Sequence, residues 1–204
     1  MRRLARIALA AVLLTGTVAA APQATQTAPA VHANDRTLGR ANAPVTVIEY
    51  ASFTCHACGD WQILVWPEFK RRFVDTGRVR FVFRNMPTDP IELSGPAAAL
   101  GRCAAPERFF DTVHALFEGQ PALLRGGDQQ VWYNAGVAAS GRTRAQIDAC
   151  VARPEIRTFL EAEVSAAAAA GVTGTPAFFV NGRRVADRTL GGLEIAIRNA
   201  EEGR

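Results

Sequence analysis

The spacing of apolar residues changes twice in the first half of the chain. Residues 45–50 are β-branched and mostly apolar, which predicts a buried strand. After Cys58, apolar side chains recur at helical spacing, at Trp61, Val65, Phe69 and Phe73. Pro67 falls inside this pattern and predicts a kink or a restart of the helix. Residues 79–83 alternate in the manner of a second strand, so the three segments together predict a β-α-β unit.

The second half of the chain begins with a long stretch that lacks strand signals. Glycine and proline divide this stretch into five segments that each predict a helix: 94–103, 107–117, 129–139, 143–151 and 155–170. Two short β-like runs follow at 177–180 and 183–185, and the Asn181-Gly182 pair between them predicts a hairpin. Residues 190–200 predict a final amphipathic helix. The expected order is therefore β-α-β, an all-helical insertion, and β-β-α.

The beginning of the chain differs in composition from the rest. Residues 1–20 combine three arginines, a short apolar run and small residues at its end, which is the layout of a secretory signal peptide. The run is shorter than the ~18–20 apolar residues that span a bilayer, so we expect cleavage and export to the periplasm. Residues 21–36 are rich in Ala, Pro, Gln and Thr and predict a disordered linker. The predicted folded domain is then 37–204.

The charge of the chain gives no indication of a nucleic-acid partner. The 204 residues include 23 basic and 19 acidic side chains, and 49% are hydrophobic, as in ordinary globular proteins. Loss of the three arginines in the predicted signal leaves 20 basic side chains against 19 acidic ones. The sequence has no basic stripe interleaved with aromatic residues. We therefore expect no nucleic-acid binding.

The clearest chemical signal is Cys55-His56-Ala57-Cys58, at the junction of a predicted strand and a predicted helix. Free N–H groups and the helix dipole at a helix N-terminus stabilise an anion, so Cys55 is expected to form a thiolate near neutral pH. A thiolate attacks disulfides, and Cys58 could then displace the mixed disulfide. The alternatives are a structural staple and half of a zinc site. Zinc needs two more ligands at a matching spacing, so we expect redox chemistry and no metal.

Two further positions fit a redox site. Glu49 lies in the first predicted strand among apolar neighbours. A buried carboxylate there would have a raised pKa and could exchange a proton with Cys58; the alternative is a solvated glutamate at a strand edge. Thr175-Pro176 begins an apolar strand after a glycine-rich approach and is a candidate cis peptide. His56 either favours the Cys55 thiolate or is solvated and passive.

The other two cysteines, Cys103 and Cys150, fall on predicted helices of the insertion. In an exported protein an even number of cysteines permits disulfides, and a structural disulfide between these two is the favoured state. The loop that it closes would stabilise the fold by ~4 kcal/mol in the chain-entropy model. Two free buried thiols and a second redox relay are the alternatives.

These residues and their neighbours resemble DsbA-like proteins, the disulfide-forming branch of the thioredoxin superfamily. The stretches that carry the resemblance are 38–45, 49–58, 81–87, 114–117 and 174–182. The resemblance extends from about residue 37 to 200. It implies an α/β thioredoxin fold whose two halves are separated by an all-helical insertion at about 92–170.

The resemblance also implies roles for individual residues. Cys55 would be the attacking cysteine, Cys58 the resolving cysteine and Glu49 the buried acid. Pro176 would be the cis-proline beside the active site, and Thr175 would bind an extended substrate strand by β-augmentation. A second cysteine pair in the insertion occurs in some relatives.

The function that the resemblance implies is that of a monomeric dithiol oxidase. It would introduce disulfides into reduced, unfolded exported proteins, with no cofactor beyond its own Cys55–Cys58 disulfide. A quinone-linked membrane protein, DsbB-like or vitamin-K-epoxide-reductase-like, would reoxidise it. His56-Ala57 departs from the Pro-His or Pro-Tyr of strong oxidases, which leaves the reduction potential open. A thiol-disulfide reductase, a specialist thiol donor in metalloprotein maturation, and a non-catalytic peptide-binding chaperone or metal carrier are the alternatives.

Overall fold

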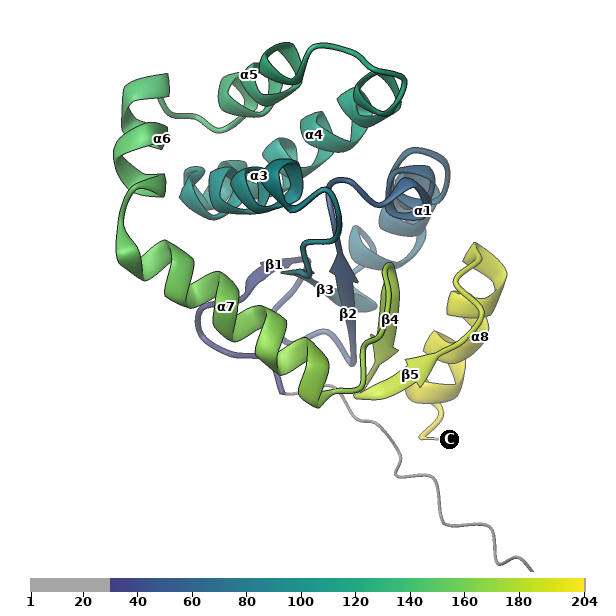
Figure 1. Ribbon diagram of the computed structural model, residues 1–204. Helices are drawn as coiled ribbons and strands as arrows, with labels where there is room; N and C mark the ends of the chain where they lie inside the picture. Colours follow the sequence, from purple (N-terminus) through teal and green to yellow (C-terminus); the bar gives the residue numbers. More distant parts are fainter. Residues whose placement is uncertain (1–29, 204) are drawn as a thin grey trace, which may run out of the picture.

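The computed structural model describes residues 30–203, in which one five-stranded sheet forms the centre (Figure 1). The strands follow the order β1-β3-β2-β4-β5 across the sheet. Their bounds are β1 (Arg36–Leu38), β2 (Val45–Ala51), β3 (Val79–Asn85), β4 (Ala177–Val180) and β5 (Arg183–Val185). β2 and β3 are parallel, and the other neighbours are antiparallel. The predicted signal peptide lies outside the described residues.

A bent helical stretch connects β2 to β3. It consists of α1 (His56–Asp60), a π-helical turn at Trp61–Val65, α2 (Trp66–Phe69) and a second π-helical turn at Lys70–Val74. Pro67 is the second residue of α2, directly after the first π-helical turn. Proline has no N–H and its ring clashes with the preceding turn of a regular helix, which the wider π-helical turn relieves. The predicted irregularity at Pro67 is confirmed.

Five α-helices form the insertion between β3 and β4, as the sequence predicts, and a 3₁₀ turn at Pro106–Arg108 precedes the second of them. They are α3 (Ile91–Cys103), α4 (Phe109–Leu124), α5 (Gln129–Ala139), α6 (Arg144–Val151) and α7 (Pro154–Ala169). Thr143 and Gln146 make a reciprocal capping box at the start of α6. After β5 the chain ends in α8 (Leu190–Glu201). Within residues 30–203, no helix is both long enough and apolar enough to cross a bilayer.

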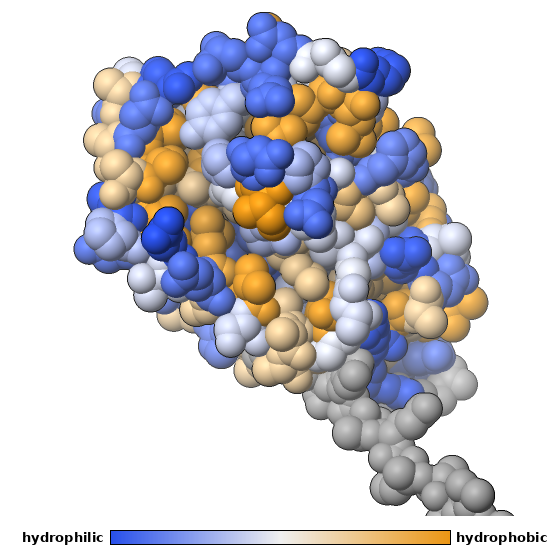
Figure 2. Space-filling view, in the orientation of Figure 1, coloured by the Kyte–Doolittle hydropathy of each residue, from blue (hydrophilic) through white to orange (hydrophobic). Residues whose placement is uncertain are grey.

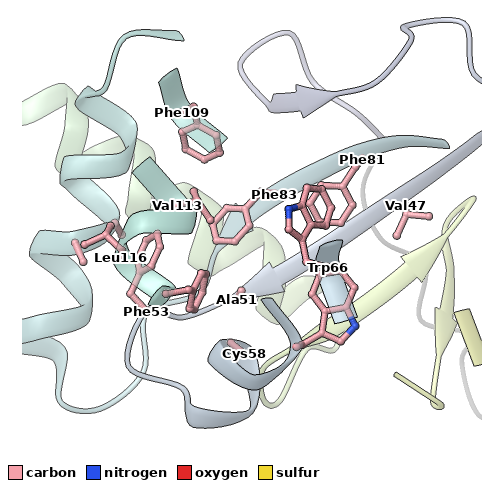
Figure 3. Close-up of a cluster of buried hydrophobic side chains, with 14 of the residues drawn as sticks. Val47, Ala51, Phe53, Cys58, Trp66, Phe81, Phe83, Phe109, Val113 and Leu116 are labelled. Carbon is pink, nitrogen blue, oxygen red and sulfur yellow. The ribbon is translucent and has the colours of Figure 1, made fainter. Parts of the chain in front are cut away.

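The two faces of the sheet are covered by different helices. Alternation along β2 sends Ile48 and Tyr50 to the face where α7 packs, against Ala167 and Ala170. Val47 and the other odd-numbered residues of β2 face the larger core. Figure 3 shows that aromatic side chains of the sheet and of the bent helix meet residues of α4 in this core. The insertion is thus packed onto the same core that lies behind α1.

An apolar groove runs along the outside of the insertion, between α3 and α7. Its lining includes Ile91, Pro96, Ile156, Leu160 and Val164. Figure 2 shows apolar side chains interspersed with polar ones on the face that α7 crosses. The packing of the insertion therefore leaves some apolar surface exposed.

The folded chain begins earlier than the sequence predicts. We expected a linker up to residue 36, whereas Arg36 already belongs to β1, which pairs with β3. The side chain of Asp35 is only 6% exposed and accepts hydrogen bonds from the guanidinium of Arg84 at 2.8 and 3.0 Å. Arg84 also donates to the carbonyl of Ala30 at 3.0 Å. A short polar segment has no apolar pattern, so its docking onto a buried arginine leaves no periodic signal in the sequence.

The predicted hairpin between β4 and β5 is confirmed. Asn181 and Gly182 have φ angles of 44° and 79°, and β4 pairs with β5 in antiparallel register. Both central residues of a type I′ turn need this left-handed conformation, which asparagine and glycine adopt at low cost. The hairpin sets β4 beside β2 and so brings residues 175 and 176 to the end of the sheet where α1 begins.

Candidate active site

Cys55 occupies the N-cap position of α1, after the short turn that follows β2. Its Sγ accepts a hydrogen bond from the backbone N–H of Cys58 at 3.3 Å. The hydrogen bond with the Cys58 thiol is the main cause that lowers the pKa of Cys55 to about 6, and Thr175 and two backbone N–H groups add to it. A cysteine with this pKa is mostly a thiolate at neutral pH.

Cys58 has the opposite environment one helical turn further on. Its side chain is fully buried, and both Cys55 and Cys58 are free thiols in this structure. Burial is the largest cause that raises the pKa of Cys58, and its hydrogen bond to Cys55 acts in the same direction. The pair therefore combines one accessible thiolate with one buried, protonated thiol.

Glu49 is buried in β2, and the alternative of a solvated edge position is wrong. Its side chain is 0% exposed, and it lies on the same face of β2 as Val47 and Ala51. Oε2 accepts a hydrogen bond from Nε2 of Gln62 at 2.8 Å, whereas Oε1 is buried without a partner. Burial raises the pKa of Glu49 well above its usual value. A neighbouring carboxyl of this kind can hold a proton at neutral pH.

The loop before β4 completes the site from a distant part of the sequence. The Thr175–Pro176 peptide bond is cis, and Sγ of Cys55 lies 3.3 Å from the carbonyl oxygen of Thr175, to which it donates when it is protonated. Arg188 donates to the carbonyl of Pro176 at 3.2 Å, while its own carbonyl accepts the indole N–H of Trp61 at 3.1 Å. These contacts tie the cis-proline loop to the helical stretch that carries the cysteines.

The two residues between the cysteines are exposed. Nδ1 of His56 lies 3.1 Å from the carboxylate of Asp60, one turn along the exposed side of α1. Ala57 is also exposed and borders a groove next to the cysteines. The structure therefore gives His56 a carboxylate partner at the surface.

Gln120 is the clearest contribution to the site that sequence reasoning missed. It lies on α4, is 1% exposed, and donates through Nε2 to the carbonyls of Phe53 and Cys55 at 2.8 and 3.0 Å. Gln62, the partner of Glu49, was also missed. A glutamine within a helical pattern carries no local signal, because only the packing of α4 against α1 brings Gln120 to the cysteines.

The other cysteine pair forms a disulfide, as the sequence favours. Cys103 on α3 and Cys150 on α6 are joined, with their Cα atoms 5.8 Å apart. The alternative of two free buried thiols does not describe this structure. Among residues 30–203, no group of three or more His, Cys, Asp or Glu side chains is arranged to hold a metal ion.

The fold and the paired cysteines define a protein of the thioredoxin class. This chain belongs to the thioredoxin family, because the family model described as "Thioredoxin" matches residues 32–199. Its fold is also that of solved DsbA-type structures. Oxidised BdbD from Bacillus subtilis superposes with a TM-score of 0.77 at 20% identity, covering 88% of this chain and 99% of BdbD.

Two further relatives extend the comparison. The α-DsbA1 protein of Wolbachia pipientis has a TM-score of 0.74 at 25% identity, covering 85% of this chain and 94% of that protein. An inferred protein-disulfide oxidoreductase of Rickettsia conorii is 27% identical over 172 residues, which cover 83% of this chain. This chain spans 61% of the length of the Rickettsia protein.

Proposed function

We propose that this protein is an exported thiol:disulfide oxidoreductase that introduces disulfides into reduced, unfolded proteins of the periplasm. One observation carries the proposal: Cys55, with a pKa of about 6, lies at the start of the same helix as the buried Cys58, whose pKa is raised. Membership of the thioredoxin family and the names of its DsbA-type relatives support it. The redox-active group is the cysteine pair itself, so the reaction uses no other cofactor.

The reaction begins with the Cys55–Cys58 disulfide. A client thiolate attacks Sγ of Cys55, a client–Cys55 bond forms, and the Cys55–Cys58 bond breaks. Cys58 leaves as a thiolate and takes up a proton because its buried position disfavours the charge. A second client thiolate then attacks the client sulfur of the mixed disulfide and releases the Cys55 thiolate. The client loses two electrons and gains a disulfide, while the enzyme becomes the dithiol.

Glu49 is the group that we expect to exchange the proton of Cys58. Its raised pKa allows it to carry a proton at neutral pH, and the charge of Glu49 raises the pKa of Cys58. Protonated Glu49 can therefore supply a proton when Cys58 leaves, and it can accept one when the enzyme is reoxidised. Gln62 orients the carboxyl group through its hydrogen bond to Oε2.

The cis-proline loop is the proposed binding site for the client. An extended client segment can pair with the backbone of Thr175 by β-augmentation, which places its cysteine next to Cys55. The neighbouring groove, which includes Trp61, Leu64 and Pro176, offers apolar contacts for the client side chains. Leu64 is 75% exposed there, so a client can cover it.

Reoxidation completes the proposed cycle. A quinone-linked membrane protein, DsbB-like or vitamin-K-epoxide-reductase-like, would accept two electrons from reduced Cys55 and Cys58. We propose that the enzyme acts as a monomer, because each step uses one cysteine pair and one cis-proline loop.

The decisive experiment is the reduction potential of the Cys55–Cys58 pair. The mature protein is titrated against glutathione redox buffers, and the active-site thiols are counted by alkylation. A potential near about −120 mV supports the oxidase, whereas a potential near about −270 mV indicates a reductase and contradicts the proposal. In a second assay, Cys55→Ser is expected to abolish the catalysed oxidation of a reduced dithiol peptide. Activity retained by this variant would refute the mechanism.

A further inference from the structure

The carboxamide of Gln120 connects the helical insertion to the turn that carries the nucleophile. Both of its N–H donors are used, one on the carbonyl of Phe53 at 2.8 Å and one on the carbonyl of Cys55 at 3.0 Å. The two carbonyls lie on either side of Thr54, in the buried turn between β2 and α1. One side chain thus holds two peptide groups of this turn.

The carbonyl of Cys55 connects the turn to the first hydrogen bonds of α1. It also accepts the backbone N–H groups of Cys58 at 3.0 Å and Gly59 at 3.1 Å, which begin the hydrogen bonding of α1. The same N–H of Cys58 lies 3.3 Å from Sγ of Cys55. The orientation of the Cys55 peptide therefore decides how the first N–H groups of α1 point at the sulfur. The donors of Gln120 also offset the partial negative charge of two carbonyl oxygens, which would otherwise disfavour a thiolate beside them.

Gly59 provides the space for this contact. A Cβ atom on residue 59 would overlap with Oε1 of Gln120 and would lie 2.8 Å from its Cδ. Carbon and oxygen atoms that are not bonded to each other do not approach so closely, so any larger residue at 59 must push Gln120 away. The close approach of α4 to α1 requires a glycine at position 59, opposite Gln120. The contact is therefore specific to this pair of residues.

We propose that Gln120 is a positioning residue of the redox pair. Its carboxamide orients the Cys55 peptide and thereby stabilises the Cys55 thiolate relative to the thiol and to the disulfide. The inference rests on the proposed function, in which the stability of this thiolate determines the oxidising power of the enzyme. Because α4 supplies the side chain of Gln120, the helical insertion then takes part in the redox chemistry.

The test replaces Gln120 with methionine, which has a similar unbranched length and no donors. The pKa of Cys55 is measured in the reduced protein from the pH dependence of thiolate absorbance and of alkylation. We expect Gln120→Met to raise this pKa and to shift the equilibrium with glutathione toward the protein disulfide by about threefold to tenfold. A tenfold shift corresponds to a potential that is about 30 mV more negative.

A matched control separates positioning from general disturbance of α4. Thr112 is buried on the same helix, and within residues 30–203 its hydroxyl bonds only to the carbonyl of Arg108, in the insertion. Thr112→Val is expected to leave the pKa of Cys55 and the glutathione equilibrium unchanged. Gly59→Ala, which displaces Gln120, is expected to shift both quantities in the same direction as Gln120→Met.

Two outcomes would overturn the inference. The first is an unchanged Cys55 pKa and glutathione equilibrium in folded Gln120→Met. The second is an equal shift in Thr112→Val. If Gln120→Met does not fold, Gln120→Leu replaces it, because leucine also lacks donors and adds no charge beside Cys55, and it is expected to raise the pKa as well. Both readouts need only the cysteine pair, so they stay interpretable if the wild-type protein fails to oxidise a peptide.

Discussion

Glu163 on α7 gives a quantitative test of how the insertion is held on the sheet. Its Oε2 accepts hydrogen bonds from Nδ2 of Asn85 at 2.9 Å and from the backbone N–H of Asn85 at 3.4 Å. Burial is the largest cause that raises the pKa of Glu163 to about 7, from an ordinary value of 4.5. The hydrogen bonds from Asn85 and the charge of Arg102 lower this pKa, while the charge of Asp35 raises it. The carboxyl group is therefore held in its protonated form at mildly acidic pH.

The sign of the pH dependence follows from the difference between the pKa of Glu163 in the folded protein, about 7, and its ordinary value of 4.5. Between pH 4.5 and about 7 the folded state binds more protons at Glu163 than the unfolded state does. The stability that the protonated group provides is complete below pH 4.5 and is lost as the pH rises to about 7. The difference of about 2.5 pKa units corresponds to about 3 kcal/mol in the free energy of unfolding. This is an upper value, because part of the Glu163 side chain stays in contact with solvent.

Glu163→Gln removes the titration and keeps an oxygen that can accept from Asn85. We expect the variant to be more stable than the wild-type protein by about 2 to 3 kcal/mol above pH 7, and to match it near pH 4. The assay is urea unfolding monitored by tryptophan fluorescence from pH 4 to 8. The oxidised protein is used so that Cys55 and Cys58 do not titrate.

The control for this assay is Glu161→Gln, an exposed position on the same helix. It is expected to change the stability by less than about 0.5 kcal/mol at every pH. Parallel pH profiles for the wild-type protein and Glu163→Gln would refute the reasoning, because the carboxyl group would then titrate equally in the folded and unfolded states.

Three other predictions follow from the contacts of single groups. Glu49→Gln is expected to slow the release of Cys58 by about tenfold to a hundredfold, because it removes the group that we propose exchanges the proton of Cys58. The rate is measured by stopped-flow fluorescence with a dithiol peptide, and an unchanged rate would exclude that role. The double variant Cys103→Ala with Cys150→Ala opens a loop with a sequence separation of 47 and is expected to lower the free energy of unfolding by about 4 kcal/mol in urea. Asp35→Ala leaves Arg84 buried without its carboxylate and is expected to cost about 3 to 5 kcal/mol in the same assay, so a neutral effect would contradict the role of this ion pair.

Most of the fold was predictable because its elements have strong local patterns. The strand at 45–50, the strands on either side of Asn181-Gly182 and the five insertion helices all appear in the structure. Their periodicity arises from burial on one face, and burial follows the period of the backbone. β1 was missed because it has only three residues, all of them partly exposed. The π-helical turns were missed as such, since proline indicates an irregular helix but not the way in which the irregularity is accommodated.

The site was predictable to the extent that its residues are close in sequence or resemble a known family. Cys55 and Cys58 share one turn of helix, so their spacing, together with their place at a strand-to-helix junction, predicts a redox pair. Thr175 and Glu49 were predicted as site residues from their apolar neighbours in the sequence and from the resemblance. The carboxamide of Gln120 and the carbonyl of Arg188 reach the site only because α4 and the loop before α8 pack there.

The sequence by itself determined the order of the elements after β1, the cysteine pair and the hairpin, because each depends on residues that are neighbours along the chain. Tertiary structure alone decided the electrostatics of the pair. It buried Glu49 and Cys58. Desolvation and hydrogen bonds between distant segments set the pKa values of these groups, and both depend on which surfaces the folded chain brings together.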